Sequence, residues 1–136
     1  MKRLFLAVAG LAWFWTMPTL AHHSFAAEFD VNVTIELKGT LTKLEWVNPH
    51  GWLYVDVADP NGKTVNWAIE VGAANALLRR GLRSGDFPIG SAVIIKGYRA
   101  KNKTPVANGT TVTFADGRNF FLGASDPPPS GAAPAP

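Results

Sequence analysis

The residues of this chain best suited to chemistry are its three histidines. His22 and His23 are adjacent, and His50 stands in the sequence Asn-Pro-His-Gly. The chain contains no cysteine, and no Ser-His-Asp spacing points to a hydrolase. Imidazole nitrogens are good ligands for Cu(II), Zn(II) and Ni(II). The residue types therefore favour a metal site with His22, His23 and His50 as candidate ligands.

His22 gains a second ligand atom if proteolysis makes it the first residue, because its amine and its imidazole then form a chelate. A cut one residue earlier leaves Ala21-His22-His23, in which the amine, two deprotonated amides and the third-position histidine surround Cu(II) in a square plane. Metal binding by the chain that starts at His22 should weaken as pH falls through the histidine range near 6.5. The alternative is that both histidines merely ease cleavage and lie in solvent.

His50 lies in the expected connection between the first two strands. Loops often carry function, but Asn-Pro-x-Gly is also a common turn sequence in which a histidine can simply hydrogen-bond the turn. His50 could join a terminal metal site only if the N-terminal arm folds back to this loop.

Four residues around the same loop form a candidate ligand face: Trp46, Asn48, Trp52 and Tyr54. Side chains two residues apart on a strand share a face. Trp52 and Tyr54 should therefore point to the face opposite Leu53, Val55 and Val57. Exposed aromatic side chains on a small barrel can stack bases or sugars. The alternative is ordinary packing.

Core packing is the expectation for Trp67, which shares its parity with Val65 and Ile69. The nearby charged residues Lys43, Glu45 and Asp56 nearly cancel. Nucleic acid is therefore not expected at this face, and a neutral small molecule or a protein contact is favoured.

Residues 1–21 have the pattern of a secretory signal peptide: Lys2-Arg3, an apolar run of 12 residues, and Thr-Leu-Ala before His22. A membrane-spanning helix needs about 20 apolar residues, so no stable membrane span is expected after processing. We predict cleavage before His22 and a periplasmic location.

The remaining composition indicates one near-neutral domain. The chain has 136 residues, 13 basic and 10 acidic; without Lys2 and Arg3 the balance is 11 against 10, a net charge of +1. A multi-domain enzyme is excluded by length, and a strongly basic nucleic-acid surface by charge. With no disulfide possible, the mature domain must be stabilised by core burial.

The hydrophobic pattern predicts an all-β fold with one short helix, namely a five-stranded OB-fold-like barrel. The parity of the first strand changes between Leu41 and Leu44, which indicates a bulge beside Gly39. An SH3-like barrel is the alternative, but it gives no reason for the helix. The expected strands are 33–47, 52–57, 65–71, 92–98 and a final hairpin of 109–114 with 119–122, and the expected helix is 73–80.

The expected domain therefore spans residues 22–124, and residues 125–136, rich in Pro and Ala, should form a disordered tail. Several motifs are distributed over nearly all of the mature chain: His22-His23-Ser24-Phe25, Gly39-Thr40, residues 45–50 (Glu-Trp-Val-Asn-Pro-His), residues 66–68 (Asn-Trp-Ala) and residues 75–81. Together they resemble a family of small exported bacterial proteins known only as a domain of unknown function. The resemblance implies export and a single domain, and it implies no reaction.

Three functions are compatible with these features. The first is a non-enzymatic periplasmic binding module for Cu(II) or another divalent ion. The second is a barrel that binds a small ligand or a periplasmic protein, with incidental histidines. The third is a copper-dependent redox enzyme, for which a small barrel offers little room for a substrate groove. The carboxylates, Glu45 and Glu70 among them, are scattered in sequence and predict no acid/base pair.

Overall fold

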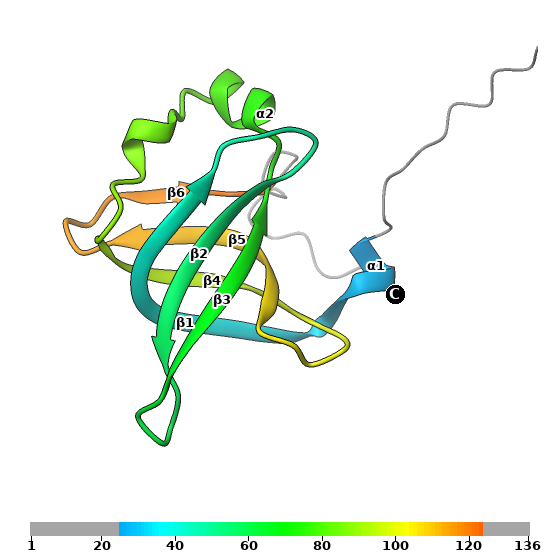
Figure 1. The fold of residues 1–136 in the computed structure, drawn as a ribbon. Helices are drawn as coiled ribbons and strands as arrows, with labels where there is room; N and C mark the ends of the chain where they lie inside the picture. The colour runs from blue at the N-terminus through cyan, green and yellow to red at the C-terminus, as the bar shows by residue number, and fades with distance from the viewer. Residues whose placement is uncertain (1–24, 124–136) are drawn as a thin grey trace, which may run out of the picture.

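The computed structural model describes residues 25–123, which form a mostly β structure with short helices (Figure 1). The predicted signal peptide, His22, His23 and the predicted tail lie outside the described residues. The elements are α1 (Phe25–Glu28), β1 (Phe29–Glu45), β2 (Gly51–Ala58), β3 (Thr64–Val71), α2 (Ala74–Arg79), the 3-10 helix η1 (Ser84–Asp86), β4 (Ala92–Ala100), β5 (Val106–Phe114) and β6 (Asn119–Phe121).

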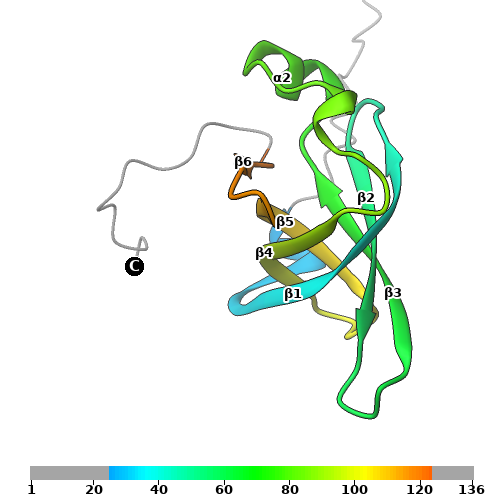
Figure 2. The ribbon, with the colours of Figure 1, turned by 90° about the vertical axis from the view of Figure 1, so that its left-hand side faces the viewer.

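The six strands form one sheet in the order β3-β2-β1-β4-β5-β6, with antiparallel neighbours. An additional parallel pairing joins residues 68–70 of β3 to residues 106–108 of β5. Because β3 pairs with both β2 and β5, the strands β3, β2, β1, β4 and β5 curl into a near-ring. Figures 1 and 2 show this near-ring from two directions. The prediction of a mostly β fold is confirmed; the predicted final hairpin is present as β5 and β6, and β6 extends the sheet beyond the five strands of the near-ring.

Two short helical segments were missed by sequence analysis. α1 has four residues and η1 has three, too few to produce a helical hydrophobic period. The helix predicted over 73–80 is present as α2, and it ends before Gly81, whose φ of +85° is the left-handed conformation that glycine adopts readily.

The predicted irregularity in β1 is confirmed. The pairing of β1 with β2 shifts register between Leu41 and Lys43, which turns Leu44 to the opposite parity from Leu41. At Gly39 a Cβ atom would lie 2.2 Å from the Asp56 carbonyl oxygen. The bend therefore depends on a residue without a side chain, because β2 passes directly against this backbone.

The core lies inside the near-ring. Leu53, Val55, Ile69 and Ile95 are almost completely buried, as the alternation of apolar residues predicts. Trp67 packs against this core, as expected, but it is only half-buried. It lies nearer the β2–β3 hairpin, where the Arg99 guanidinium is positioned 5.6 Å from the centre of its ring.

The other end of the near-ring holds an aromatic cluster, defined here as Trp46, Phe87, Phe114 and Phe120. Phe87 is 2% exposed and its ring centre lies 5.7 Å from Trp46, 6.0 Å from Phe114 and 5.7 Å from Phe120. Phe87 follows η1, so the segment between α2 and β4 supplies the central ring of the cluster.

The β1–β2 loop is attached to α2. The first N–H groups of a helix lack partners within the helix. Here the Val47 carbonyl accepts from the Ala74 N–H at 3.0 Å, and the Asn48 side-chain oxygen accepts from the Asn75 N–H at 3.2 Å. These bonds fix the loop that leads into His50.

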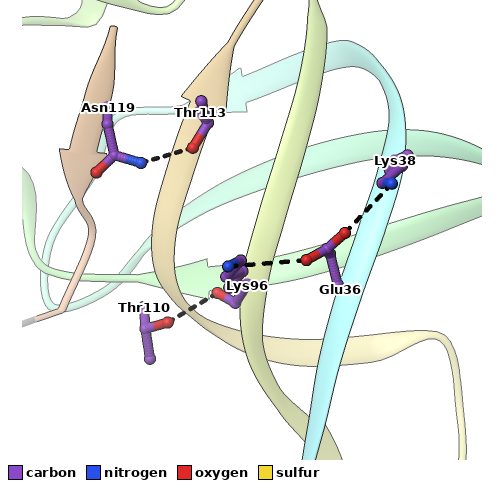
Figure 3. A network of polar contacts seen from close by, with 6 residues as sticks. All are labelled: Glu36, Lys38, Lys96, Thr110, Thr113 and Asn119. Atoms are coloured by element: carbon purple, nitrogen blue, oxygen red, sulfur yellow. Dashed lines mark hydrogen bonds and ion pairs between the residues drawn. The ribbon is translucent and has the colours of Figure 1, made fainter. Parts of the chain in front are cut away.

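The outer surface of β1, β4, β5 and β6 carries polar side chains (Figure 3). Glu36 of β1 lies between two lysines, 3.4 Å from Lys38 and 3.8 Å from Lys96, and all three are exposed. Exposed ion pairs of this kind contribute little to stability. Across residues 25–123, no helix has the length and apolar character needed to cross a membrane.

Candidate ligand-binding site around His50

His50 contacts a carboxylate rather than only its own turn. Its Nδ1 atom lies 3.4 Å from Oε1 of Glu70, near the end of β3. The strand register explains the contact, because Gly51 pairs with Val71 and Trp52 pairs with Glu70, which brings the residue before β2 beside the end of β3. The side chain of His50 is 34% exposed and that of Glu70 only 14%.

Glu70 has a second polar neighbour across the closure of the near-ring. The Asn108 side-chain N–H donates to Oε1 of Glu70 at 3.3 Å. Glu70 and Asn108 are register partners in the parallel β3–β5 pairing, and their strand neighbours Ile69 and Ala107 are fully buried. The polar pair therefore lies on the outer face of the ring, directly over the core.

His50 and Glu70 line a cavity of about 360 Å³, which we call the His50 cavity. Its size is within the range of small-ligand sites. The walls come from four parts of the chain: α1 with the start of β1, the β1–β2 loop with the end of β3, the middle of β5, and β6 with the residues after it. The lining residues are Phe25, Glu28, Phe29, His50, Glu70, Val71, Gly72, Asn108, Thr110, Phe121 and Gly123.

Ring contacts hold α1 against this cavity. The Phe25 ring lies edge-on to Tyr98 at 5.5 Å and also 5.5 Å from Phe29. The Lys101 ammonium donates to the Ala26 carbonyl at 2.5 Å. The start of the described chain is thus held beside His50.

The opposite wall is held by Arg80. Its guanidinium donates to the Gly123 carbonyl and lies 5.2 Å from the centre of the Phe121 ring. The Gly72 N–H also donates to the Leu122 carbonyl at 2.7 Å. Arg80, which directly follows α2, thus anchors the last described segment.

This arrangement suits an imidazole that acts through Nε2. A carboxylate beside Nδ1 favours the tautomer with its proton on Nδ1, which leaves the lone pair of Nε2 available to a ligand. Within residues 25–123, no three His, Asp or Glu side chains are grouped as a metal site. A metal site that includes His50 therefore needs ligands from elsewhere in the chain, and the candidates His22 and His23 lie outside the described residues.

The four residues of the candidate ligand face do not lie on one surface. Trp46 packs against Phe87 in the aromatic cluster, and Asn48 caps α2. Trp52 and Tyr54 are half-buried on the face opposite Leu53, as their parity predicts. Of the four, Trp52 is the one whose register partner, Glu70, belongs to the His50 cavity.

Tyr54 is covered by a charged pair. The Lys43 ammonium lies 4.8 Å from the centre of its ring and donates to Glu45 at 2.5 Å. That hydrogen bond raises the pKa of Lys43 and lowers the pKa of Glu45 relative to their ordinary values. Glu45 therefore interacts with Lys43, whereas Glu70 interacts with His50, so these two carboxylates do not form an acid/base pair.

Comparison with known families gives one match. The profile of a family described as "Family of unknown function (DUF6152)" matches residues 12–110. The chain belongs to DUF6152. No curated protein and no solved structure matches the chain. The DUF6152 match includes His50, Glu70 and Asn108, whereas β6 lies after it.

Sequence analysis did not identify Asn108, Phe25 or Glu28 as cavity residues, and it considered Glu70 only as an isolated carboxylate. The alternation in β3 indicates that Glu70 faces away from Ile69, but nothing in the sequence specifies which residue of β5 lies beside Glu70. The missing information is the strand register, which tertiary structure alone supplies.

Proposed function

We propose that this protein is an exported binding module in which the His50 cavity holds a divalent metal ion, with Cu(II) as the leading candidate. The imidazole of His50 supplies one ligand through Nε2. His22, as the first residue of the processed chain, supplies its amine and imidazole, and His23 is an alternative ligand. Softness and geometry favour copper for such a nitrogen-rich set.

The observation that carries this proposal is the position of Phe25 in the lining of the His50 cavity. His22 is three residues before Phe25. An extended residue covers at most about 3.6 Å, so the Cα atom of His22 lies within roughly 11 Å of that of Phe25. A terminus that begins three residues before a side chain lining the His50 cavity supports a site that His22 or His23 shares with His50.

Glu70 has a positioning role in this proposal. Metal-binding histidines commonly donate their second ring N–H to a carboxylate, which fixes the ring and increases its basicity. Asn108 in turn donates to the same carboxylate oxygen. The series from Asn108 through Glu70 to His50 would orient Nε2 before any metal binds.

We further propose that the near-ring is a barrel of the OB type and that the processed protein is periplasmic. The strand order, the parallel β3–β5 pairing and the helix between β3 and β4 support the barrel assignment. The basic residues, apolar run and small residues of 1–21 support export.

A second candidate function is binding of a small uncharged ligand in the same cavity without metal. Phe25, Phe29, Val71 and Phe121 give the cavity substantial apolar walls, with His50 and Asn108 as polar contacts. This function needs no free N-terminus, which distinguishes it from metal binding.

The test compares copper binding by three proteins after mass spectrometry of the exported N-terminus. The protein starting at His22 should bind one Cu(II). A form with a longer N-terminal extension, in which neither His22 nor His23 is among the first three residues, and the His22→Ala variant should both bind more weakly by about tenfold or more, since the chelate is lost. Glu36→Gln, an exposed carboxylate outside the cavity, is the matched control and should bind normally. Equal binding by all forms would contradict the terminal site.

A further inference from the structure

A second cavity lies at the hairpin end of the near-ring, between the β2–β3 hairpin and the β4–β5 loop at the bottom of Figure 1. Its volume is about 380 Å³. We call it the Trp67 cavity. Its lining residues are Leu37, Val57, Ala58, Asp59, Pro60, Val65, Trp67, Arg99, Lys103 and Pro105, none of which lines the His50 cavity.

Arg99 is an unusual residue for an inward-facing strand position. Its register partner on β5 is Ala107, which is fully buried, so Arg99 is on the core side of β4. Its guanidinium lies 5.6 Å from the centre of the Trp67 ring. One terminal nitrogen donates to the Lys103 carbonyl at 2.9 Å, whereas Nε is buried without a hydrogen-bond partner among the described residues.

A buried donor without an acceptor is costly in a folded protein. A carboxylate in the cavity would give Arg99 an acceptor once the guanidinium turns toward it, because carboxylates accept paired hydrogen bonds from a guanidinium. Arg99 is thus a polar residue of the cavity wall whose guanidinium N–H groups are only partly satisfied by acceptors among the described residues.

The charge of the cavity also favours an anion. Lys103 provides a second cation at the rim. The one acidic lining residue, Asp59, already accepts the backbone N–H groups of Asn61 and Lys63, each at 2.8 Å, and so serves the hairpin turn. The walls are otherwise apolar, with the Trp67 indole as the largest surface.

We propose that the Trp67 cavity binds a small organic acid that carries one carboxylate on a planar aromatic body. The aromatic body lies against Trp67 and the prolines, and the carboxylate contacts Arg99 and Lys103. The volume accommodates a small ligand rather than a polymer. This site is independent of the proposed metal site, since it shares no lining residue with the His50 cavity.

Nuclear magnetic resonance of the ¹⁵N-labelled protein, recovered after expression of the full chain, tests this site. The indole N–H signal of Trp67, identified with Trp67→Phe, is followed during titration with 2-naphthoate. A saturable shift is expected, with a dissociation constant on the order of 0.1–1 mM for a ligand of this size. The neutral analogue 2-naphthalenemethanol should bind about tenfold more weakly, and acetate should produce no saturable shift.

Variants identify the cation responsible. Arg99→Gln should weaken 2-naphthoate binding by about tenfold while leaving the neutral analogue unchanged, and Lys103→Gln should weaken it by about two- to threefold. Arg118→Gln is the matched control, because Arg118 also lies over an aromatic ring, that of Phe114, but outside this cavity. If Arg99→Gln does not fold, the proposal is still tested by Lys103→Gln and by comparing 2-naphthoate, 2-naphthalenemethanol and acetate on the wild type. Equal binding of 2-naphthoate and its neutral analogue to the wild type would overturn the proposal, as would an unchanged affinity in Lys103→Gln.

Discussion

The aromatic cluster and the His50 cavity are built on the same sheet but use their side chains in opposite ways. In the aromatic cluster, Phe87 is surrounded by three other rings and is 2% exposed. In the His50 cavity, an imidazole and a carboxylate are kept half-buried above Ile69 and Ala107. The space in the aromatic cluster is filled with apolar atoms, whereas polar atoms remain accessible in the His50 cavity.

The difference indicates that stability and binding are separable in this fold. Burial of apolar side chains, large rings among them, contributes most of the favourable free energy of folding, whereas polar groups near the surface contribute little net stability. Changes in the aromatic cluster should therefore unfold the protein, and changes in the His50 cavity should alter binding while the fold persists.

The largest effect is expected for Phe87→Ala, which should reduce the free energy of unfolding by about 3–5 kcal/mol because it leaves a cavity between three rings. Urea denaturation followed by tryptophan fluorescence measures the loss. Ile89→Ala is the matched control, since Ile89 is only two residues away and 57% exposed; a loss within about 0.5 kcal/mol is expected there. Similar losses of unfolding free energy at Phe87 and Ile89 would contradict the central position of Phe87 in the aromatic cluster.

Gly39→Ala should have the next largest effect, because it tests the bend that lets β1 contribute to both regions. The new methyl group would meet the Asp56 carbonyl oxygen at 2.2 Å and a Val55 methyl group at 2.8 Å. A loss of about 1–3 kcal/mol is expected from such overpacking. Gly85→Ala, where a Cβ atom meets nothing within 4 Å, should be nearly neutral in the same denaturation assay. A neutral Gly39→Ala would refute the close approach of β2.

His50→Ala sharpens the comparison from the binding side. The free energy of unfolding of the metal-free protein should change by about 0.5 kcal/mol or less, because the side chain is 34% exposed and lies outside the core cluster. Copper affinity should fall by about tenfold or more, and Glu70→Gln should lower it by a similar factor if the carboxylate orients the imidazole. Calorimetric titration measures both. A destabilised protein with unchanged affinity would reverse the roles assigned to the two regions.

The smallest effect concerns the polar edge of the aromatic cluster. The Arg118 backbone N–H and guanidinium both donate to Asp116, which lowers the pKa of that carboxyl below its ordinary value of 3.8. A lowered native-state pKa stabilises the fold above the unfolded-state pKa, and this contribution disappears as pH falls through the native-state value. Asp116→Asn should therefore melt slightly below the wild type at pH 6, and the gap should narrow progressively as pH falls below 3.8. A gap independent of pH would exclude this ion pair as its cause.

Local patterns were sufficient to predict much of the fold. The alternation of apolar residues identified the inward faces of β2 and β3, and the parity change between Leu41 and Leu44 identified the bulge. Phe87 was not identified, because it lies among Ser, Gly, Asp and Pro residues that indicate a loop, and a single aromatic residue has no period.

The candidate site was predictable only in part. His50 was selected from its residue type and its loop, and it does line a cavity. Glu70, Asn108 and Phe25 reach the same cavity through the β2–β3 register, the β3–β5 closure and the α1 ring contacts. Each of these is a contact between residues distant in sequence, so no local pattern encodes it.

The most direct test of the separation between stability and binding is pulsed electron paramagnetic resonance of the Cu(II)-loaded protein that starts at His22. Histidine-specific ¹⁵N labelling reports the imidazole nitrogens coupled to the copper, and the wild type is compared with His50→Ala. We expect one more imidazole to be coupled to Cu(II) in the wild type than in His50→Ala. Without metal, both proteins should unfold at the same urea concentration. Identical copper spectra in the two proteins would contradict the assignment of the His50 cavity as the binding site.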